Sequence, residues 1–164
     1  MQSFENKASK SKTILLTAFV AGTLDIVAAT LVYGVIMQRA TALEILSGIA
    51  AGLFGKTVIG NETVMAVIGL ILHYFIAFCF TGFYFFVSRY MAFLRNNAII
   101  SGLLYGIFVW MVMNLVVLPL SQAYNAPFTW PGFLRSVVIL MLCIGLPISL
   151  MAAKYYKHAN VNTT

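Results

Sequence analysis

Four long apolar segments constrain this chain more than any other feature of its sequence. Each is about 20 residues or longer, which is the length that an α-helix needs to cross a hydrocarbon core about 30 Å thick. Helices suit such segments because a helix satisfies its own backbone hydrogen bonds where no water is present. We expect the four spans at residues 13–37, 63–88, 98–120 and 132–153.

The composition argues against a water-soluble fold. Of the 164 residues, 62% are hydrophobic and only 9% are charged, and the mean hydropathy is +0.96. So little polar surface does not cover a globule in water. Four spans with short connections use most of the chain, so the sequence predicts a single domain over 1–164. Its class is all-α, a polytopic membrane four-helix bundle with polar termini at 1–12 and 154–164, the latter ending in a disordered tail.

A fifth apolar segment, residues 42–54, is too short to cross a membrane. As a helix it measures about 20 Å. Thr41 followed three residues later by Glu44 is a capping-box pattern, which predicts that a helix begins there, and Gly55 marks its end. We therefore expect a short interfacial or re-entrant helix, and the sequence leaves the two placements open.

Lysine and arginine are distributed unevenly between the two ends of the predicted spans. Cytoplasmic segments of membrane proteins are enriched in these residues, so both termini are expected in the cytoplasm. The net charge of +6 is interpreted as orienting helices and contacting anionic membrane lipids, and not as a nucleic-acid surface. The predicted cytoplasmic side has seven basic residues and the other side three: Lys7, Lys10, Lys12, Arg89, Arg95, Lys154 and Lys157, against Arg39, Lys56 and Arg135.

Asp25 lies near the middle of the first span, where an ionisable side chain is costly unless it is paired, neutralised or hydrated. Its neighbours one helical turn away are all small, namely Ala21, Gly22, Ala28 and Ala29. Small residues let another helix approach closely. This face is therefore predicted to pack against a neighbouring span and to keep Asp25 away from lipid.

The second span repeats this arrangement around His73, because Ala66, Gly69 and Ala77 share its face. At about 1.5 Å per residue, Asp25 lies roughly 18 Å from the cytoplasmic side and His73 roughly 15 Å from the outer side, so both are near the midplane. Two interpretations stay open. In one, Asp25 and His73 form a hydrogen bond or ion pair in a proton-responsive site; in the favoured one, their contact fixes helix register.

The third span carries a G-x-x-x-G packing face that ends in a polar amide. Gly102, Gly106, Trp110 and Asn114 follow one another at steps of four residues. Asn114 either joins the polar pair as a third member of an intramembrane site or bonds a backbone carbonyl freed by Pro119. The second interpretation is favoured.

Several chemistries lack the residues that they need. The sequence has no H-E-x-x-H or G-x-S-x-G motif, no phosphate-binding loop, no cluster of Cys and His, and no second membrane histidine for a haem. We therefore predict no catalytic residue, no metal site and no cofactor. Cys79 and Cys143 form no C-x-x-C pair and are interpreted as small buried hydrophobic residues, and Pro147 as a kink.

The stretch from His73 to Pro119 resembles the YagU-like family of small bacterial inner-membrane proteins. The likeness is carried by FTGFYFF at 80–86, a short basic connection, and SGLLYGIFVWMVMNLVVLPL at 101–120. The segment ILSGIAAGLFGK at 45–56 is similar to a glycine-rich segment of related bacterial membrane proteins. The resemblance implies a multi-pass inner-membrane protein with a part in acid tolerance, and it brings no catalytic residues.

Three functions are compatible with the sequence. The leading one is a non-catalytic bundle that supports envelope homeostasis or acid tolerance, alone, as a homo-oligomer or with a membrane-protein partner. The second is a small oligomeric channel or transporter in which Asp25, His73 and Asn114 line a polar route. The third is an intramembrane enzyme acting on a lipid or quinone, with His73 as general base and Asp25 orienting it.

Overall fold

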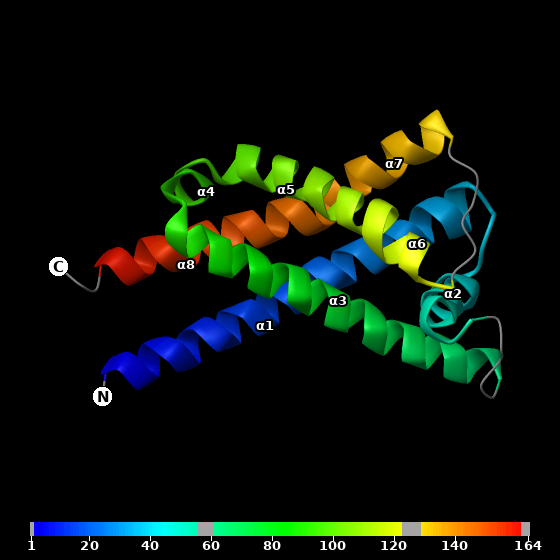
Figure 1. The fold of residues 1–164 in the computed structure, drawn as a ribbon, viewed down its shortest axis with the longest axis horizontal. Coiled ribbons are helices and arrows are strands. Elements are labelled where there is room, and N and C mark those ends of the chain that lie inside the picture. Colours follow the sequence, from blue (N-terminus) through cyan, green and yellow to red (C-terminus); the bar gives the residue numbers. More distant parts are fainter. Residues whose placement is uncertain (1, 56–60, 123–128, 162–164) are drawn as a thin grey trace.

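The computed structural model describes residues 2–55, 61–122 and 129–161, with side chains for 10–55, 61–122 and 129–157. Every element in these ranges is helical (Figure 1). The predicted all-α class is confirmed. Lys56 and the side chain of Lys7, both used in the orientation argument, lie outside the described residues.

Four helices are long and apolar enough to cross a membrane, so the chain is a multi-pass membrane protein. They cover Lys10–Ile36, Glu62–Tyr90, Ala98–Leu120 and Trp130–Lys157, close to the predicted spans. The spans consist of α1 (Gln2–Ala29) with the π-helix η1 (Thr30–Ile36); α3 (Glu62–Tyr90); α5 (Ala98–Val112) with η2 (Met113–Val117) and α6 (Leu118–Leu120); and α7 (Trp130–Leu140) with η3 (Met141–Gly145) and α8 (Leu146–Val161).

The two ends of the chain are more helical than the sequence predicts. Helix α1 begins at Gln2, within the predicted polar segment 1–12, and α8 continues to Val161, where a disordered tail was expected. The expected disorder of the C-terminal tail is therefore wrong as far as Val161. Lengthening an existing helix costs far less free energy than starting one, and Lys154 and Lys157 in the final turns of α8 interact favourably with its dipole.

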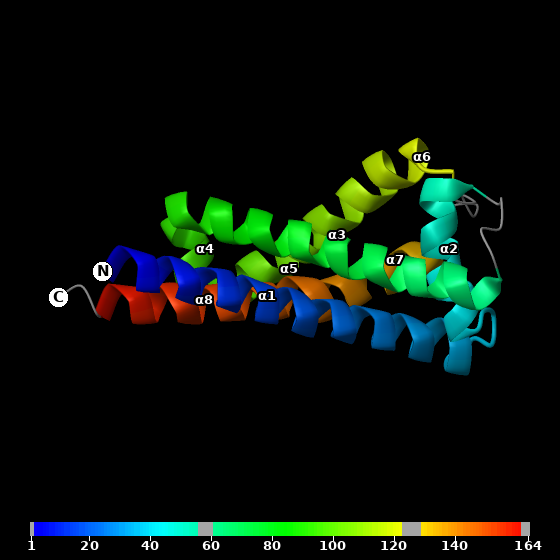
Figure 2. The ribbon, with the colours of Figure 1, turned by 90° about the horizontal axis from the view of Figure 1, so that it is seen from below.

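Successive spans run in opposite directions, which gives the bundle two distinct ends (Figure 1). Both chain termini and α4 (Ala92–Asn96) lie at one end, called here the terminal end. Helix α2 (Ala42–Phe54) and α6 lie at the other, the α2 end. Figure 2 shows α2 running across the spans and not alongside them. Of the two predicted placements, interfacial and re-entrant, this direction fits the interfacial one.

Two helix contacts are so close that only glycine fits between the backbones. Gly69 of α3 lies against α2, where an added Cβ would overlap the carbonyl oxygen of Leu46. Gly102 and Gly106 of α5 pack against Gly145 of η3, and a Cβ on Gly145 would overlap the carbonyl oxygen of Gly102. Association of helices in lipid depends on such van der Waals contact, because lipid tails are as apolar as the helices.

Three of the four spans contain a π-helical segment, and two of these segments precede a proline. Met113–Val117 ends two residues before Pro119, and Met141–Gly145 ends two residues before Pro147. Proline has no N–H to donate and its ring clashes with the carbonyl four residues earlier. A wider π turn relieves both problems. At Pro147, where the sequence predicts a kink, the preceding turn is π-helical.

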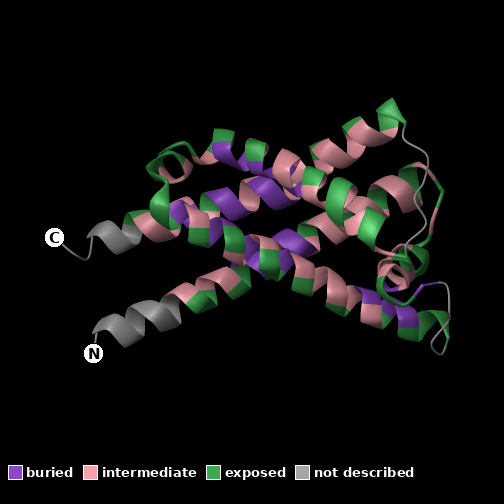
Figure 3. Cartoon of the chain, in the orientation of Figure 1, coloured by how far each residue is buried: buried purple, intermediate pink, exposed green. Residues whose placement is uncertain are grey.

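Buried residues gather where the spans cross, and most of the outer surface is intermediate or exposed (Figure 3). Most exposed side chains along the spans are apolar, including Ile36 at 75% and Leu120 at 82% exposure. Such a surface would aggregate in water but matches hydrocarbon. The buried core cluster consists of Ala21, Tyr84, Phe85, Tyr105, Val109, Ile144, Ile148 and Ala152.

The contact between Gly102 and Gly145 generates a stability prediction. Gly145→Ala should lower the free energy of unfolding by about 1–3 kcal/mol, because the new methyl group forces two backbones apart. Gly82→Ala is the matched control, since nothing lies within 4 Å of the position of its Cβ. Unfolding in detergent by denaturant titration measures both, and equal stability of the two variants would contradict the close contact.

Candidate functional site

The centre of the bundle contains a cavity of about 100 Å³ to which all four spans and α2 contribute. Asp25 of α1 and His73 of α3 are the titratable residues in its lining. This space is large enough to admit water. The rest of the lining is apolar: Ile49, Ile76, Ala77, Phe80, Val109, Met113, Leu140 and Ile144.

The imidazole of His73 is fixed by the backbone of the neighbouring span. Its Nε2 lies 2.8 Å from the carbonyl oxygen of Gly22. A carbonyl can only accept, so Nε2 carries the proton in this bond. Because a neutral imidazole has one N–H, Nδ1 of neutral His73 is the nitrogen that can still take up a proton.

Asp25 and His73 share the cavity without a direct bond. The described residues contain no hydrogen bond and no ion pair within 4.0 Å between the two side chains, and Nε2 of His73 contacts the carbonyl of Gly22 instead. The predicted direct contact is therefore corrected. The two groups lie close enough to interact electrostatically, and Asp25 is half-buried. An interaction through the cavity replaces the contact that the sequence predicts.

Tyr74 adds a second polar link beside His73. Its hydroxyl lies 2.8 Å from Oγ1 of Thr23, while Thr23 donates its own proton to the carbonyl of Phe19 at 2.8 Å. Tyr74 is therefore the donor in their mutual bond, and its ring also stacks on Phe19 with 5.4 Å between centroids. Sequence reasoning missed both residues, although Tyr74 directly follows the histidine.

Cys143 brings a third titratable group near Asp25. It lies on η3, is half-buried, and interacts electrostatically with the carboxyl of Asp25. Cys79, in contrast, is exposed on α3, so its predicted burial is wrong. An apolar sequence context indicates burial only for a protein in water. In a membrane, an apolar side chain is as stable facing lipid as it is inside the protein.

The small residues predicted to pack around Asp25 and His73 do not all contact the same helix, and some are only half-buried. Ala21 and Gly22 are buried, and a Cβ on Gly22 would lie 3.0–3.2 Å from atoms of Tyr74 and Ala77. Ala28 and Ala29 are only half-buried. Ala66 is buried on the face of α3 that also carries Gly69, and the atoms nearest to a Cβ on Gly69 belong to Leu46 and Ala50 of α2.

Asn114 lies apart from the polar pair. Its Nδ2 donates to the carbonyl of Trp110 at 3.0 Å, at the point where α5 passes into the π-helix. The bond is to a backbone carbonyl, as the favoured interpretation has it, but to the one four residues earlier and not one beside Pro119. Met113, its neighbour, lines the cavity in its place.

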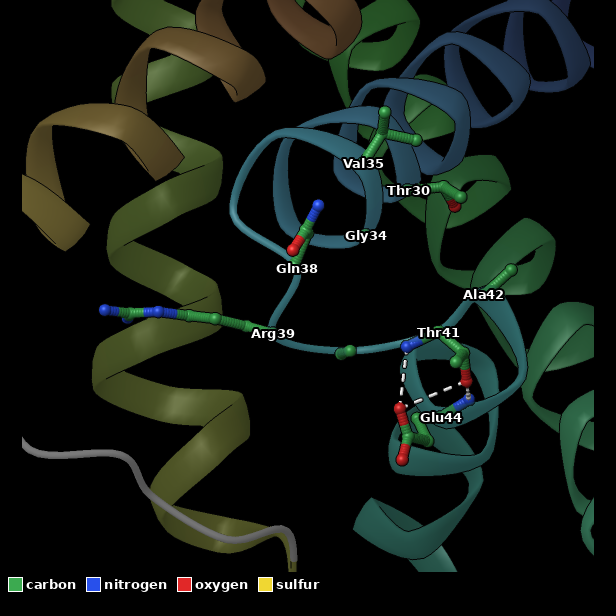
Figure 4. Close-up of a pocket in the computed structure, with 9 residues that line it drawn as sticks. Thr30, Gly34, Val35, Gln38, Arg39, Thr41, Ala42 and Glu44 are labelled. Carbon is green, nitrogen blue, oxygen red and sulfur yellow. Dashed lines mark hydrogen bonds between the residues drawn. The ribbon is translucent and has the colours of Figure 1, made fainter.

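A larger hollow of about 450 Å³ opens at the α2 end between η1 and α2 (Figure 4). The capping box lies in it: the N–H of Thr41 donates to Glu44 Oε2 at 2.6 Å, and the N–H of Glu44 donates to Thr41 Oγ1 at 3.2 Å. These bonds lower the pKa of Glu44 below its ordinary value. Arg39 points away from both residues in Figure 4, and the polar groups of Thr41 and Glu44 bond to one another at the start of α2.

The chain matches no protein-family model, and no curated protein or solved structure is significantly similar to it. The resemblance to the YagU-like family thus stays a prediction. The candidate site rests on its own geometry: a central cavity with one acid and one histidine from adjacent spans.

The lowered pKa of Glu44 predicts how the start of α2 responds to acid. The carboxylate stabilises the helix start at every pH above the ordinary glutamate range, and this stabilisation is lost as the pH falls through the lower pKa of the folded state. Glu44→Gln keeps the hydrogen-bonding pattern of a capping box without the titration. Amide exchange of Thr41, corrected for intrinsic rates, should accelerate on acidification in the parent and stay constant in Glu44→Gln. Equal acceleration in both would contradict this assignment.

Proposed function

We propose that this protein is a non-catalytic, multi-pass protein of the bacterial inner membrane whose central cavity responds to protons, and that it serves envelope homeostasis under acid stress. The observation that carries the proposal is the shared cavity of Asp25 and His73. A histidine inside a membrane bundle is costly unless it has a use or a partner, and histidine is the residue type that serves as a proton-dependent switch in many proteins.

Proton uptake by His73 would act on the contact between α1 and α3. An imidazolium strengthens the bond from Nε2 to the carbonyl of Gly22, because hydrogen bonds from charged donors are about twice as strong as neutral ones. The new positive charge also interacts with the carboxyl group of Asp25 across the cavity. Acid would therefore tighten the first two spans against each other.

Few groups around the cavity can take part in the proposed response to protons. The cavity wall contributed by α2, α5, η2, α7 and η3 is apolar, with Ile49, Val109 and Met113 among its members. Among the described residues, Cys143 is the further titratable group that interacts with Asp25. Tyr74, next to His73, is engaged with Thr23.

The proposed location follows from charge and resemblance. The terminal end carries the larger number of lysines and arginines, which supports cytoplasmic N- and C-termini. The likeness of residues 80–86 and 101–120 to the YagU-like family supports the bacterial inner membrane and the link to acid.

A small oligomeric channel or transporter is the second candidate. It is favoured by the π-helical segments η2 and η3, which place Met113 and Ile144 on the cavity wall, since π segments occur often at functional sites. Asn114 is engaged with its own helix, so a route would depend on Asp25 and His73.

Acid survival of cells that lack the gene tests the proposal. Complementation with the parent chain should restore survival, whereas Asp25→Asn and His73→Gln should restore little of it at equal membrane abundance. Hydrogen exchange of the purified protein, corrected for intrinsic rates, should show slower exchange of α1 and α3 at pH 5 than at pH 8 in the parent and no difference in His73→Gln.

Full rescue by both variants, or an unchanged difference between pH 5 and pH 8 in His73→Gln, would overturn the proposal. Proteoliposomes separate the two candidate functions. The proton-responsive bundle predicts membranes that stay tight to protons, and a proton flux abolished by Asp25→Asn would favour the channel.

A further inference from the structure

Two cationic side chains, one from α1 and one from α4, lie over the same tyrosine ring at the terminal end of the bundle. Lys10 Nζ of α1 lies 6.0 Å from the ring centroid of Tyr156 in α8, and Arg95 Cζ of α4 lies 5.7 Å from it. Arg95 also donates to the backbone carbonyl of Arg89 at 3.3 Å. The side chain of Arg89 lies 5.8 Å from the ring centroid of Tyr90, and both arginines act electrostatically on the phenol of Tyr156. These four residues, Lys10, Arg89, Arg95 and Tyr156, are called here the basic cluster.

No acid balances the basic cluster among the residues whose side chains are described. Asp25 lies at mid-span, and Glu44 and Glu62 lie at the α2 end. Glu5, the fourth acid, lies on α1 outside the residues whose side chains are described. Lys10 and Arg95 flank one ring, so their charges are at most about 12 Å apart, a distance on the order of the Debye length. Repulsion between them favours an anion in the basic cluster.

The ring of Tyr156 is held in place independently of any ligand. Its hydroxyl donates to the carbonyl of Phe85 at 2.7 Å, which ties α8 to α3. The ring also lies 6.2 Å from that of Phe85. The cations from α1 and α4 therefore gather around a fixed aromatic platform, which favours them through its π-face.

We infer that the basic cluster binds the phosphate head group of an anionic phospholipid. The basic cluster lies at the end of four apolar spans, at the level where tyrosines and head groups meet. Below Lys10, the side chains of Leu15 and Leu16 on α1 are 59% and 54% exposed and offer an apolar surface to the acyl chains. A free phosphate would use the cations but not this surface. The inference is independent of the Asp25 and His73 cavity.

Lipid titration of the detergent-solubilised protein, followed by native mass spectrometry, tests the inference. Phosphatidylglycerol should bind at least tenfold more tightly than phosphatidylcholine. The double variant K10Q/R95Q should weaken phosphatidylglycerol binding by roughly 10- to 30-fold, from about 1 kcal/mol for each cation. The single variant R89Q changes an exposed side chain and should weaken binding by about fivefold.

The matched control is K154Q/K157Q, which removes two exposed charges from the same end of the bundle but outside the basic cluster. It should leave the affinity within about twofold. Equal weakening by this control, or equal binding of phosphatidylcholine, would overturn the inference, because either result means that the surface charge as a whole and no built site attracts the lipid. Displacement of the lipid by millimolar inorganic phosphate would also overturn it, in favour of a soluble anion.

Discussion

A polar group inside hydrocarbon must find its partner within the protein, and this constraint arranges the interior of the bundle. Between α1 and α3, His73 satisfies this requirement by donating to the carbonyl of Gly22. Between α5 and α3, Tyr105 does so by donating to the carbonyl of Phe80. In both cases the acceptor is a helix carbonyl and not another side chain. Hydrogen bonds of this kind stabilise the association of the helices. The hydrophobic effect contributes little to it, because lipid is as apolar as the helix surfaces.

Much of the fold could be predicted because span length, capping and charge act locally. The four spans and the capping box of Thr41 and Glu44 need no knowledge of which helices meet. The partners of each small residue could not be predicted in the same way. Gly69 shares a face with His73 but contacts α2, because α2 crosses the spans, and a helical period gives a direction without naming the neighbour in that direction.

For the polar site, too, the approximate position could be predicted from the sequence but the bonding partner could not. The sequence indicates that Asp25 and His73 are near the midplane, and both line one cavity. Which atom receives the histidine proton depends on the relative height of two helices, to within the length of a hydrogen bond. Packing at Gly22 sets that height, because an added Cβ would lie 3.0 Å from the ring of Tyr74. The backbone carbonyl, which no residue pattern records, is thereby placed closer to His73 than the carboxyl of Asp25 is.

Two functions are thus separated along the axis of the bundle, with a proton-responsive centre and an anion-binding end as the two proposals. The central claim is that His73 faces the first span inside the protein. Solid-state nuclear magnetic resonance in bilayers can measure the dipolar coupling between nitrogen-15 at Nε2 of His73 and carbon-13 at the carbonyl of Gly22. A measurable coupling is expected, because the nitrogen lies 2.8 Å from the oxygen bonded to that carbon; no coupling, together with contact between the imidazole and lipid acyl chains, would contradict the claim.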